Sequence, residues 1–390
     1  MVVEIGSEIR IRDVSKELYD WAQENLIIPN PQYRERERRG LWTGNTPKYL
    51  WLYHADGSDL IVPTGVGKQV RQFLSEKDKI SIHLADNGIL DYKGTIPLYD
   101  YQKEAVEAMQ RTSCGILQSP CGSGKTQMGI ALAAVLGRKV LWVTHTQDLL
   151  TQSKTRAEQY FSPETLGTIT AGKAQVGSHM TFATVQTLCK MDLEQFRYTW
   201  DVVIVDECHR LAGSPTQVTM FYKVMNNLAA RHKYGLSATV HRSDGMIKST
   251  FAVLGPVIYK VPDEAVADKT MQVRILQRNT DITVSRSCLD TDGTLDYNEL
   301  LSYLGGNRER NEMIVKDLVN QKGHSCLILA SRLVSPQKDY AVVTQSIGRI
   351  ARKAEGKTDA VCYDYVDDIQ FCENQFKRRK THYRKAGCIL

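Results

Sequence analysis

Long hydrophobic runs are missing from this chain of 390 residues, although 42% of its residues are hydrophobic. No apolar stretch approaches the roughly 20 residues that a helix needs to cross a bilayer, so the sequence predicts no membrane partner. The first residues, among them Glu4, Glu8 and Arg10, lack the apolar core of a signal peptide. We therefore expect a cytoplasmic protein.

Paired cysteines are also missing. The nine cysteines are odd in number and scattered, and no two of them form a Cys-x-x-Cys pair. This spacing argues against a disulfide framework and against a zinc site. It suits a reducing compartment, where thiols stay free.

The length and the local patterns predict several domains. The chain has room for two or three domains that each bury a core. Residues 1–94 mix short strand patterns with turn signals and predict a small α+β N-terminal domain. Residues 95–255 alternate apolar strands with amphipathic helices, the rhythm of a parallel sheet, and residues 256–390 predict a second, related domain. The expected fold class is therefore α/β.

The apolar runs also predict where the main elements lie. In the second region, strands are expected at 115–118, 140–144, 180–183, 202–205 and 234–236, and helices at 101–110, 147–160 and 217–228. In the third region, strands are expected at 273–276, 326–329 and 361–365, around a helix at 308–319.

A glycine-rich loop lies between the first strand of the second region and the helix after it. It reads Ser119-Pro120-Cys121-Gly122-Ser123-Gly124-Lys125-Thr126. Because glycine has no Cβ, Gly122 and Gly124 let the backbone wrap closely round a polyphosphate. The loop N–H groups and the helix N-terminus direct positive charge at the phosphates, and Lys125 supplies an ammonium group. A strict P-loop has glycine in place of Ser119, and a chance glycine-rich turn is the alternative; the strand and helix context favours an ATP site.

Two acidic residues follow a second buried strand. The run Val202 to Val205 is hydrophobic and ends in Asp206 and Glu207, so both carboxylates are expected at the carboxyl edge of the parallel sheet. Thr126 and Asp206 are the expected holders of Mg²⁺. Glu207, one residue on, is expected to orient and deprotonate the attacking water. The cofactors are then ATP and Mg²⁺.

Further candidates for catalysis lie in the third region. Gln345, Arg349 and Arg352 follow spacings of four and three residues, which put them on adjoining faces of a helix. Guanidinium groups stabilise charge on a transferring phosphoryl group and contribute roughly 10³–10⁵ in rate where such arginines have been measured. Since these residues belong to another domain, hydrolysis would require the domains to close. That requirement would couple chemistry to movement.

These motifs, in this order, resemble helicase superfamily 2, the DNA and RNA motors with two RecA-like domains. The resemblance covers most of residues 98–352. It implies that Gln102 reads adenine and that Thr144, His145, Thr184 and Gln186 contact nucleic acid. It also implies that Ser237, Ala238 and Thr239 couple the ATP site to the nucleic-acid track. Without the ATP motifs, the threonine-rich segments would be read as ordinary strand ends and caps.

The details favour a motor on double-stranded DNA. The acidic motif continues as Asp206-Glu207-Cys208-His209, which differs from the Asp-Glu-Ala-Asp common in RNA helicases. Arg242 and Asp244 resemble a coupling element of XPB-like proteins, with Ser243 in place of its glutamate. The segments 28–33 and 46–49 resemble the front domain of phage UvsW-type branch-migration helicases.

This resemblance implies an ATP-hydrolysing DNA helicase that remodels forks and four-way junctions in bacterial or phage-infected cytoplasm. Its partner would be duplex or branched DNA, and the sequence names no protein partner. An RNA helicase, and a nucleic-acid-binding subunit without working catalysis, remain the alternatives.

One departure from the family pattern is large. Family members carry several tens of residues between the strand expected near 326–332 and the arginine motif, whereas only residues 333–340 lie there in this chain. A βαβ crossover needs roughly 30 residues or more. The second RecA-like domain is therefore expected to be incomplete, with a segment missing near 334–335, either by excision or by a true deletion.

Basic side chains gather near aromatic ones in the N-terminal region. Arg34 lies in a run of arginines near Tyr33, Trp42 and Trp51, and Lys48 follows shortly after. Such a mixture suits a nucleic-acid backbone or exposed bases, so Arg34 and Lys48 are candidate DNA contacts. Glutamates alternate with the arginines, and a charged, solvated helix face is the equal alternative.

Overall fold

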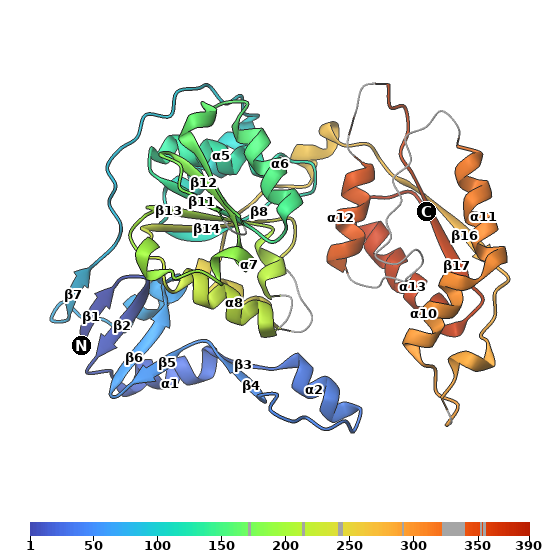
Figure 1. Cartoon of the computed structure of the whole chain (residues 1–390), viewed down its shortest axis with the longest axis horizontal. Helices are drawn as coiled ribbons and strands as arrows, with labels where there is room; N and C mark the ends of the chain where they lie inside the picture. Colours follow the sequence, from blue (N-terminus) through green and yellow to red (C-terminus); the bar gives the residue numbers. More distant parts are fainter. Residues whose placement is uncertain are drawn as a thin grey trace. The chain divides into compact units, whose positions relative to one another are not determined.

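The computed structural model describes residues 1–170, 173–212, 215–240, 245–290, 292–321, 340–351, 353 and 356–390. Contacts within the chain divide it into two compact units, each described separately below (Figure 1). The first unit comprises Met1–Pro120 and Gly124–Pro262, and the second comprises Cys121–Ser123 and Asp263–Leu390. No helix among these residues has both the length and the apolar character needed to span a membrane.

The chain begins with a small mixed sheet. Its strand order is β5-β6-β2-β1-β7, and all neighbours are antiparallel except β1 and β7. Alternate residues of β2, Ile9 and Ile11, are buried, as expected for a sheet with one covered face. The strands are β1 (Val2–Ile5), β2 (Glu8–Arg12), β5 (His54–Asp56), β6 (Asp59–Pro63) and β7 (Lys79–Ile82).

Three short helices and a two-stranded ribbon complete this region. Helix α1 (Lys16–Asn25) begins at Ser15, whose hydroxyl accepts a hydrogen bond from the Leu18 N–H, and it buries Leu18 and Ala22. The remaining elements are β3 (Ile27–Pro29), α2 (Pro31–Arg38), β4 (Tyr49–Trp51) and α3 (Gly67–Arg71).

An eight-stranded sheet forms the centre of the first unit. Its order is β11-β10-β12-β9-β13-β14-β8-β15, and every neighbouring pair is parallel except β10 and β11. All five residues of β9 and of β13 are buried, because helices cover both faces of a parallel sheet. The strands are β8 (Cys114–Gln118), β9 (Val140–Thr144), β10 (Leu166–Thr170), β11 (Lys173–Gln175), β12 (Met180–Thr184), β13 (Val202–Asp206), β14 (His232–Ser237) and β15 (Val257–Lys260).

The helices of this region are α4 (Asp100–Gln110), α5 (Lys125–Leu136), α6 (Gln147–Ala157), α7 (Val185–Leu188), α8 (Pro215–Met225) and α9 (Ile247–Leu254). The predicted α/β class is confirmed, and every strand expected in this region lies within a residue or two of its predicted bounds. Strands β10, β11 and β15 were not predicted. Strands β10 and β11 interrupt their apolar residues with polar ones, and β15 has only four residues, so none of them forms a long apolar run.

The N-terminal region shares a hydrophobic core with two helices that cover the large sheet. Val218 on α8, Met246 just before α9 and Ala252 on α9 belong to the same buried cluster as the residues of the small sheet. The packing is close at Gly65, where an added Cβ would lie 2.5 Å from the backbone nitrogen of Gly255. The N-terminal region is therefore held rigidly within the first unit. The division at 94/95 and 255/256 stays a prediction.

A buried lysine lies where the two regions meet. Lys233, at the start of β14, is only 2% exposed, and its ammonium group donates hydrogen bonds to the carbonyls of Ser7 and Met225 at 2.9 Å each. Burial lowers the pKa of Lys233 to about 7, and burial raises the pKa of the nearby Glu8. A neutral amine still has two N–H groups, which matches the two carbonyl acceptors.

The described residues of the second unit form a parallel pair of strands and four α-helices. Strands β16 (Arg274–Thr280) and β17 (Val361–Asp367) pair over their whole length. Ion pairs inside the unit hold it together: Arg379 forms a bidentate pair with Asp364, and Arg310 pairs with Asp367 at 2.6 Å. The helices are α10 (Tyr297–Gly306), α11 (Arg308–Val319), α12 (Tyr340–Ile350) and α13 (Gln370–Lys385). The strand expected at 326–329 and the junction at 334–335 lie outside the described residues.

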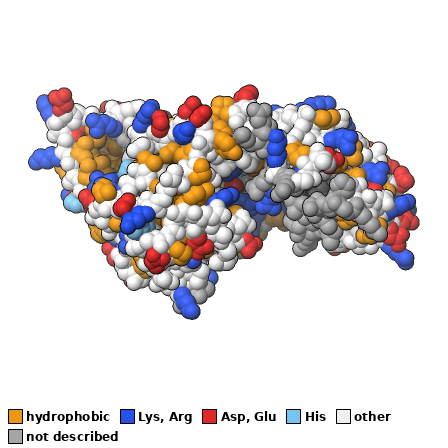
Figure 2. All heavy atoms as spheres, turned by 90° about the horizontal axis from the view of Figure 1, so that it is seen from above, with side chains coloured by type: hydrophobic (Ala, Val, Ile, Leu, Met, Phe, Trp, Pro, Cys, Tyr) orange, Lys and Arg blue, Asp and Glu red, His pale blue; other side chains and the backbone are white. Residues whose placement is uncertain are grey.

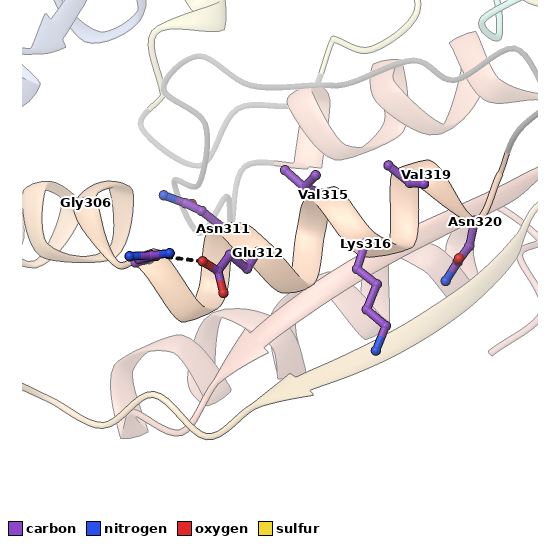
Figure 3. A pocket seen from close by; sticks show the side chains of 8 residues that line it. Gly306, Asn311, Glu312, Val315, Lys316, Val319 and Asn320 are labelled. Carbon is purple, nitrogen blue, oxygen red and sulfur yellow. Dashed lines mark hydrogen bonds and ion pairs between the residues drawn. The ribbon is translucent and has the colours of Figure 1, made fainter.

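A cavity of about 520 Å³ lies along α11 (Figure 3). Val315 and Val319 point to the same side of the helix there, and both are about half exposed. No residue predicted for the nucleotide or nucleic-acid site is among the described residues that line it.

The pKa of Lys233 predicts how the free energy of unfolding depends on pH. The pKa is about 7 in the folded protein and near 10.5 once the chain unfolds, so between these values the unfolded state binds the proton more strongly. This contribution to the free energy of unfolding therefore rises as the pH increases from about 7 toward 10.5. Thermal unfolding of the wild type and of Lys233→Met between pH 7 and 9.5 checks this. The Tm of the wild type should rise relative to the Tm of the variant as the pH increases. Parallel curves would show that Lys233 does not titrate in this way.

Candidate nucleotide and nucleic-acid site

The glycine-rich loop connects β8 to α5 at the carboxyl edge of the large sheet. Gly122 and Gly124 have φ values of 86° and 84°, the left-handed region that only glycine adopts without strain. Gly124 directly precedes α5, so the loop delivers the chain to a helix N-terminus that offers backbone N–H groups. The Lys125 ammonium group donates to the Ser119 carbonyl at 3.3 Å, which draws its side chain back over the loop.

Gln102 on α4 lies against this loop. A Cβ at Gly124 would come within 2.5 Å of the Gln102 side-chain nitrogen, so the Gln102 amide group packs directly against this glycine. Gln102 is 3% exposed, and its side-chain oxygen accepts a hydrogen bond from the Tyr99 N–H at 2.9 Å. The structure thus brings together two segments that the sequence analysis assigned to one nucleotide.

Asp206 and Glu207 end β13, next to β9 and β14. Asp206 is 5% exposed, and burial, together with the neighbouring Glu207, raises the pKa of Asp206 to about 7 although Lys125 acts in the opposite direction. Glu207 has a φ of 48°, which is uncommon for a residue with a side chain. No described residue donates a hydrogen bond to its buried Oε2 atom. Two carboxylates are therefore held in a place where a cation would relieve their desolvation.

A hydrogen-bonded chain links this acidic edge to the end of β14. The Ser237 hydroxyl donates to the Thr239 carbonyl at 2.5 Å, so its contact of 2.8 Å with His209 Nδ1 requires the imidazole to donate. Glu207 Oε2 lies 3.4 Å from the same imidazole nitrogen. His209 was not predicted as a functional residue from the sequence. Its position three residues after Asp206 was the one sequence feature that pointed to the site.

Four predicted nucleic-acid contacts lie at the ends of β9 and β12. Thr144 and Thr184 are opposite each other in the sheet, and His145 Nδ1 lies 3.2 Å from the Gln186 side-chain nitrogen. Thr144 is fully buried and donates to the Thr146 carbonyl, while Thr184 caps α7. Their hydroxyls therefore have local partners, whereas His145 and Gln186 are half-buried and open to one side.

The other predicted residues belong to other parts of the chain. Arg34 and Lys48 are exposed in the N-terminal region, and Arg349 is exposed near the end of α12 in the second unit. Gln345 belongs to α12, but its side chain, like Arg352, Arg242 and Asp244, lies outside the described residues. On the face drawn in Figure 2, basic and acidic side chains are interspersed, and no single-sign field covers it.

Comparison with known proteins shows which proteins this chain resembles. The family model "Type III restriction enzyme, res subunit" matches residues 95–242. A relative named DNA 3'-5' translocase XPB2, from Sulfurisphaera tokodaii, is 30% identical over 213 residues, which are 52% of this chain and 45% of that protein. The DNA 3'-5' helicase XPB of Mycobacterium tuberculosis is 26% identical over 174 residues, which are 42% of this chain and 30% of that protein. The predicted resemblance to superfamily 2 DNA helicases of the XPB-like group is confirmed.

Two further matches concern a virus and a phage. A putative ATP-dependent RNA helicase of Acanthamoeba polyphaga mimivirus is 25% identical over 234 residues, 57% of this chain and 44% of that protein. The crystal structure of the UvsW helicase from bacteriophage T4 overlays with a TM-score of 0.49 and 21% identity, covering 67% of this chain and 100% of that one. The chain spans less than half the length of these curated relatives.

The two cysteines of the nucleotide motifs differ in their expected reactivity. Cys121 is half-buried in the loop, whereas Cys208 is fully buried and its pKa is raised well above the usual value by burial. Because the thiolate is the reactive form, we expect alkylation at Cys121 and none at Cys208. Peptide mass spectrometry should show that ATP slows modification of Cys121. The same rate with and without ATP would place the nucleotide elsewhere.

Proposed function

We propose that this protein is an ATP-dependent DNA helicase or translocase. The observation that carries the proposal is the convergence of Gly124, Lys125 and the buried Asp206 at one edge of a parallel sheet, in a segment that resembles DNA translocases. Within this class, we infer remodelling of forks and four-way junctions in the cytoplasm of a bacterium or of a phage-infected cell.

The residues at the sheet edge fit ATP and Mg²⁺. Thr126 and Asp206 would hold the metal, because hydroxyl and carboxylate oxygens are its preferred protein ligands and the desolvated Asp206 gains from a cation. Bound Mg²⁺ would neutralise charge on the phosphates. Lys125 would bind the terminal phosphates, and Gln102 would read adenine. Glu207, whose Oε2 accepts no hydrogen bond from the described residues, would orient the attacking water and take its proton.

Coupling to DNA would run from Glu207 to His209, which lies 3.4 Å from it, and through the hydrogen bond of His209 to Ser237, with Ala238 and Thr239 after it. His145 and Gln186 would contact the nucleic-acid backbone, with Thr144 and Thr184 supporting them. Gln345, Arg349 and Arg352 would act on ATP when the domains close, and Arg242 and Asp244 would belong to the coupling element.

Two other functions compete with this proposal. An RNA helicase is favoured by the mimivirus relative, whose name describes RNA. A nucleic-acid-binding subunit without catalysis is favoured by the few residues between 332 and 341, which are too short for a βαβ crossover. ATPase activity measured on single strands, duplex DNA, forks, four-way junctions and RNA separates these functions. Stimulation by DNA but not RNA, strongest on branched DNA, is the expected result.

Lys125→Ala should lower DNA-stimulated ATP turnover by roughly 10²–10³-fold, because the variant loses the charge that stabilises the phosphates. DNA binding without ATP should be unchanged. Lys103→Ala is the matched control, since Lys103 is exposed on α4 and pairs only with Asp100 at the surface. If Lys125→Ala retained full function in a DNA-remodelling assay, the protein would be a binding subunit.

Binding of the magnesium–nucleotide complex should weaken as the pH falls below about 7. The pKa of Asp206 is raised to about 7, and a protonated carboxyl group is a poor metal ligand. Titration of a fluorescent ATP analogue between pH 6 and 8 measures this, with and without Mg²⁺. Asp206→Asn should remove the magnesium-dependent part of the pH profile; an unchanged profile would assign the titration to another group.

A further inference from the structure

The segment 27–51 carries more exposed aromatic surface than folding requires. We call this segment the arm; it consists of β3, α2, the loop after α2 and β4. Helix α2 has no buried residue, so it contributes nothing to a core. Trp42 is 85% exposed, Trp51 59% and Tyr49 44%. Aromatic side chains normally contribute stability by burial, and their exposure here indicates a surface for binding.

The ring of Trp42 is held in place although it is exposed. An added Cβ at Gly44 would lie 2.9 Å from the Trp42 ring, so the ring packs closely over this glycine. Gly44 has a φ of 53° and bends the loop back beneath the ring. The Arg36 guanidinium group reaches the Trp42 carbonyl at 3.4 Å. The ring is thus supported from below and open to solvent over most of its surface.

Two further aromatic rings share one face of the β3–β4 ribbon. Ile28 is buried in the core opposite Leu50, so the alternating neighbours Tyr49 and Trp51 point to the other, open face. Trp51 packs edge-on against the buried Tyr53 at 5.5 Å between ring centres. Like Trp42, it is therefore oriented before any ligand arrives.

The charge of the arm complements a polyanion. Its 25 residues contain five Lys or Arg and two Asp or Glu, so its net charge of +3 is half of the +6 of the whole chain. Arg38 and Arg39 both pair with Glu35, which leaves the exposed Arg34 and Lys48 to attract phosphates. The Lys48 ammonium group lies 5.9 Å from the ring centre of Tyr49, so a positive charge and an aromatic ring are available side by side for one ligand.

We infer that the arm binds unpaired bases of a nucleic acid by stacking them on Trp42, Tyr49 and Trp51, while Arg34 and Lys48 contact the backbone. Oriented aromatic rings with neighbouring cations recognise single strands, because every base has a π-face and a duplex keeps its bases stacked on one another. This inference rests on the proposed DNA-motor function and specifies its substrate: a duplex next to single-stranded DNA. The arm is continuous with the core of the first unit, so its position follows the ATP-binding sheet.

The test compares forked DNA with blunt duplex. A fork with 2-aminopurine at the first unpaired position reports stacking by a change in fluorescence. Trp42→Ala and the double variant Tyr49→Ala/Trp51→Ala should each bind the fork roughly 5- to 150-fold more weakly, the loss expected for one stacked base, and should lose the fluorescence change. Blunt-duplex binding and duplex-stimulated ATPase should stay at the wild-type level. Trp42→Phe should keep most of the affinity.

Leu41→Ala is the matched control, because Leu41 is apolar, 55% exposed and adjacent to Trp42. It should bind both DNAs like the wild type, and all variants should keep the wild-type Tm because the removed side chains are largely exposed. Wild-type affinity of Trp42→Ala and the double variant for the fork would overturn the inference and leave the DNA motor intact, as would equal losses on fork and duplex. If no DNA stimulates the wild-type ATPase, the proposed function fails first.

Discussion

Burial of Asp206 at the carboxyl edge of the parallel sheet is the constraint on which the candidate site depends. The carboxylate is withdrawn from water next to a second carboxylate, and its pKa rises although the Lys125 charge and hydrogen bonds from the Glu207 N–H and from Ser153 act in the opposite direction. Such an arrangement destabilises the folded chain unless a bound group repays it. Lys125, which directly follows the glycine-rich loop, is close enough to Asp206 for its charge to act on the pKa of this carboxyl group, so positive and negative groups lie at the same edge of the sheet.

The side chains of His209 and Ser237 connect this edge of the sheet to the end of β14. The Ser237 hydroxyl donates to the Thr239 carbonyl, so the His209 imidazole must donate to the Ser237 oxygen. The same imidazole nitrogen lies near Glu207, so the ring contacts both Glu207 and the end of β14. A change in charge at the carboxylates would alter the contacts of His209 and Ser237, and therefore the end of β14. The proposed motor function requires such a link between the site of ATP hydrolysis and the nucleic-acid site.

The N-terminal region serves the first unit as a rigid extension. Its small sheet shares a hydrophobic core with α8 and α9, and Lys233 completes the junction by donating to carbonyls from both regions. Because burying a polar group is costly unless it is hydrogen-bonded, this junction has little freedom to rotate. The exposed rings of the arm thus belong to a region that packs rigidly against the helices of the large sheet.

The sequence by itself determined the class of fold, the location of the loop and the acidic motif, and the resemblance to superfamily 2 helicases, because continuous apolar strands and glycine positions are local signals. Only the tertiary structure decided that the Thr144 hydroxyl is buried against a backbone carbonyl, and that His209 links Glu207 to Ser237. It also decided that Tyr49 and Trp51 face solvent while Leu50 faces the core. These facts depend on which strands become neighbours and which face a helix covers, and pairing between distant segments leaves no mark in a local pattern.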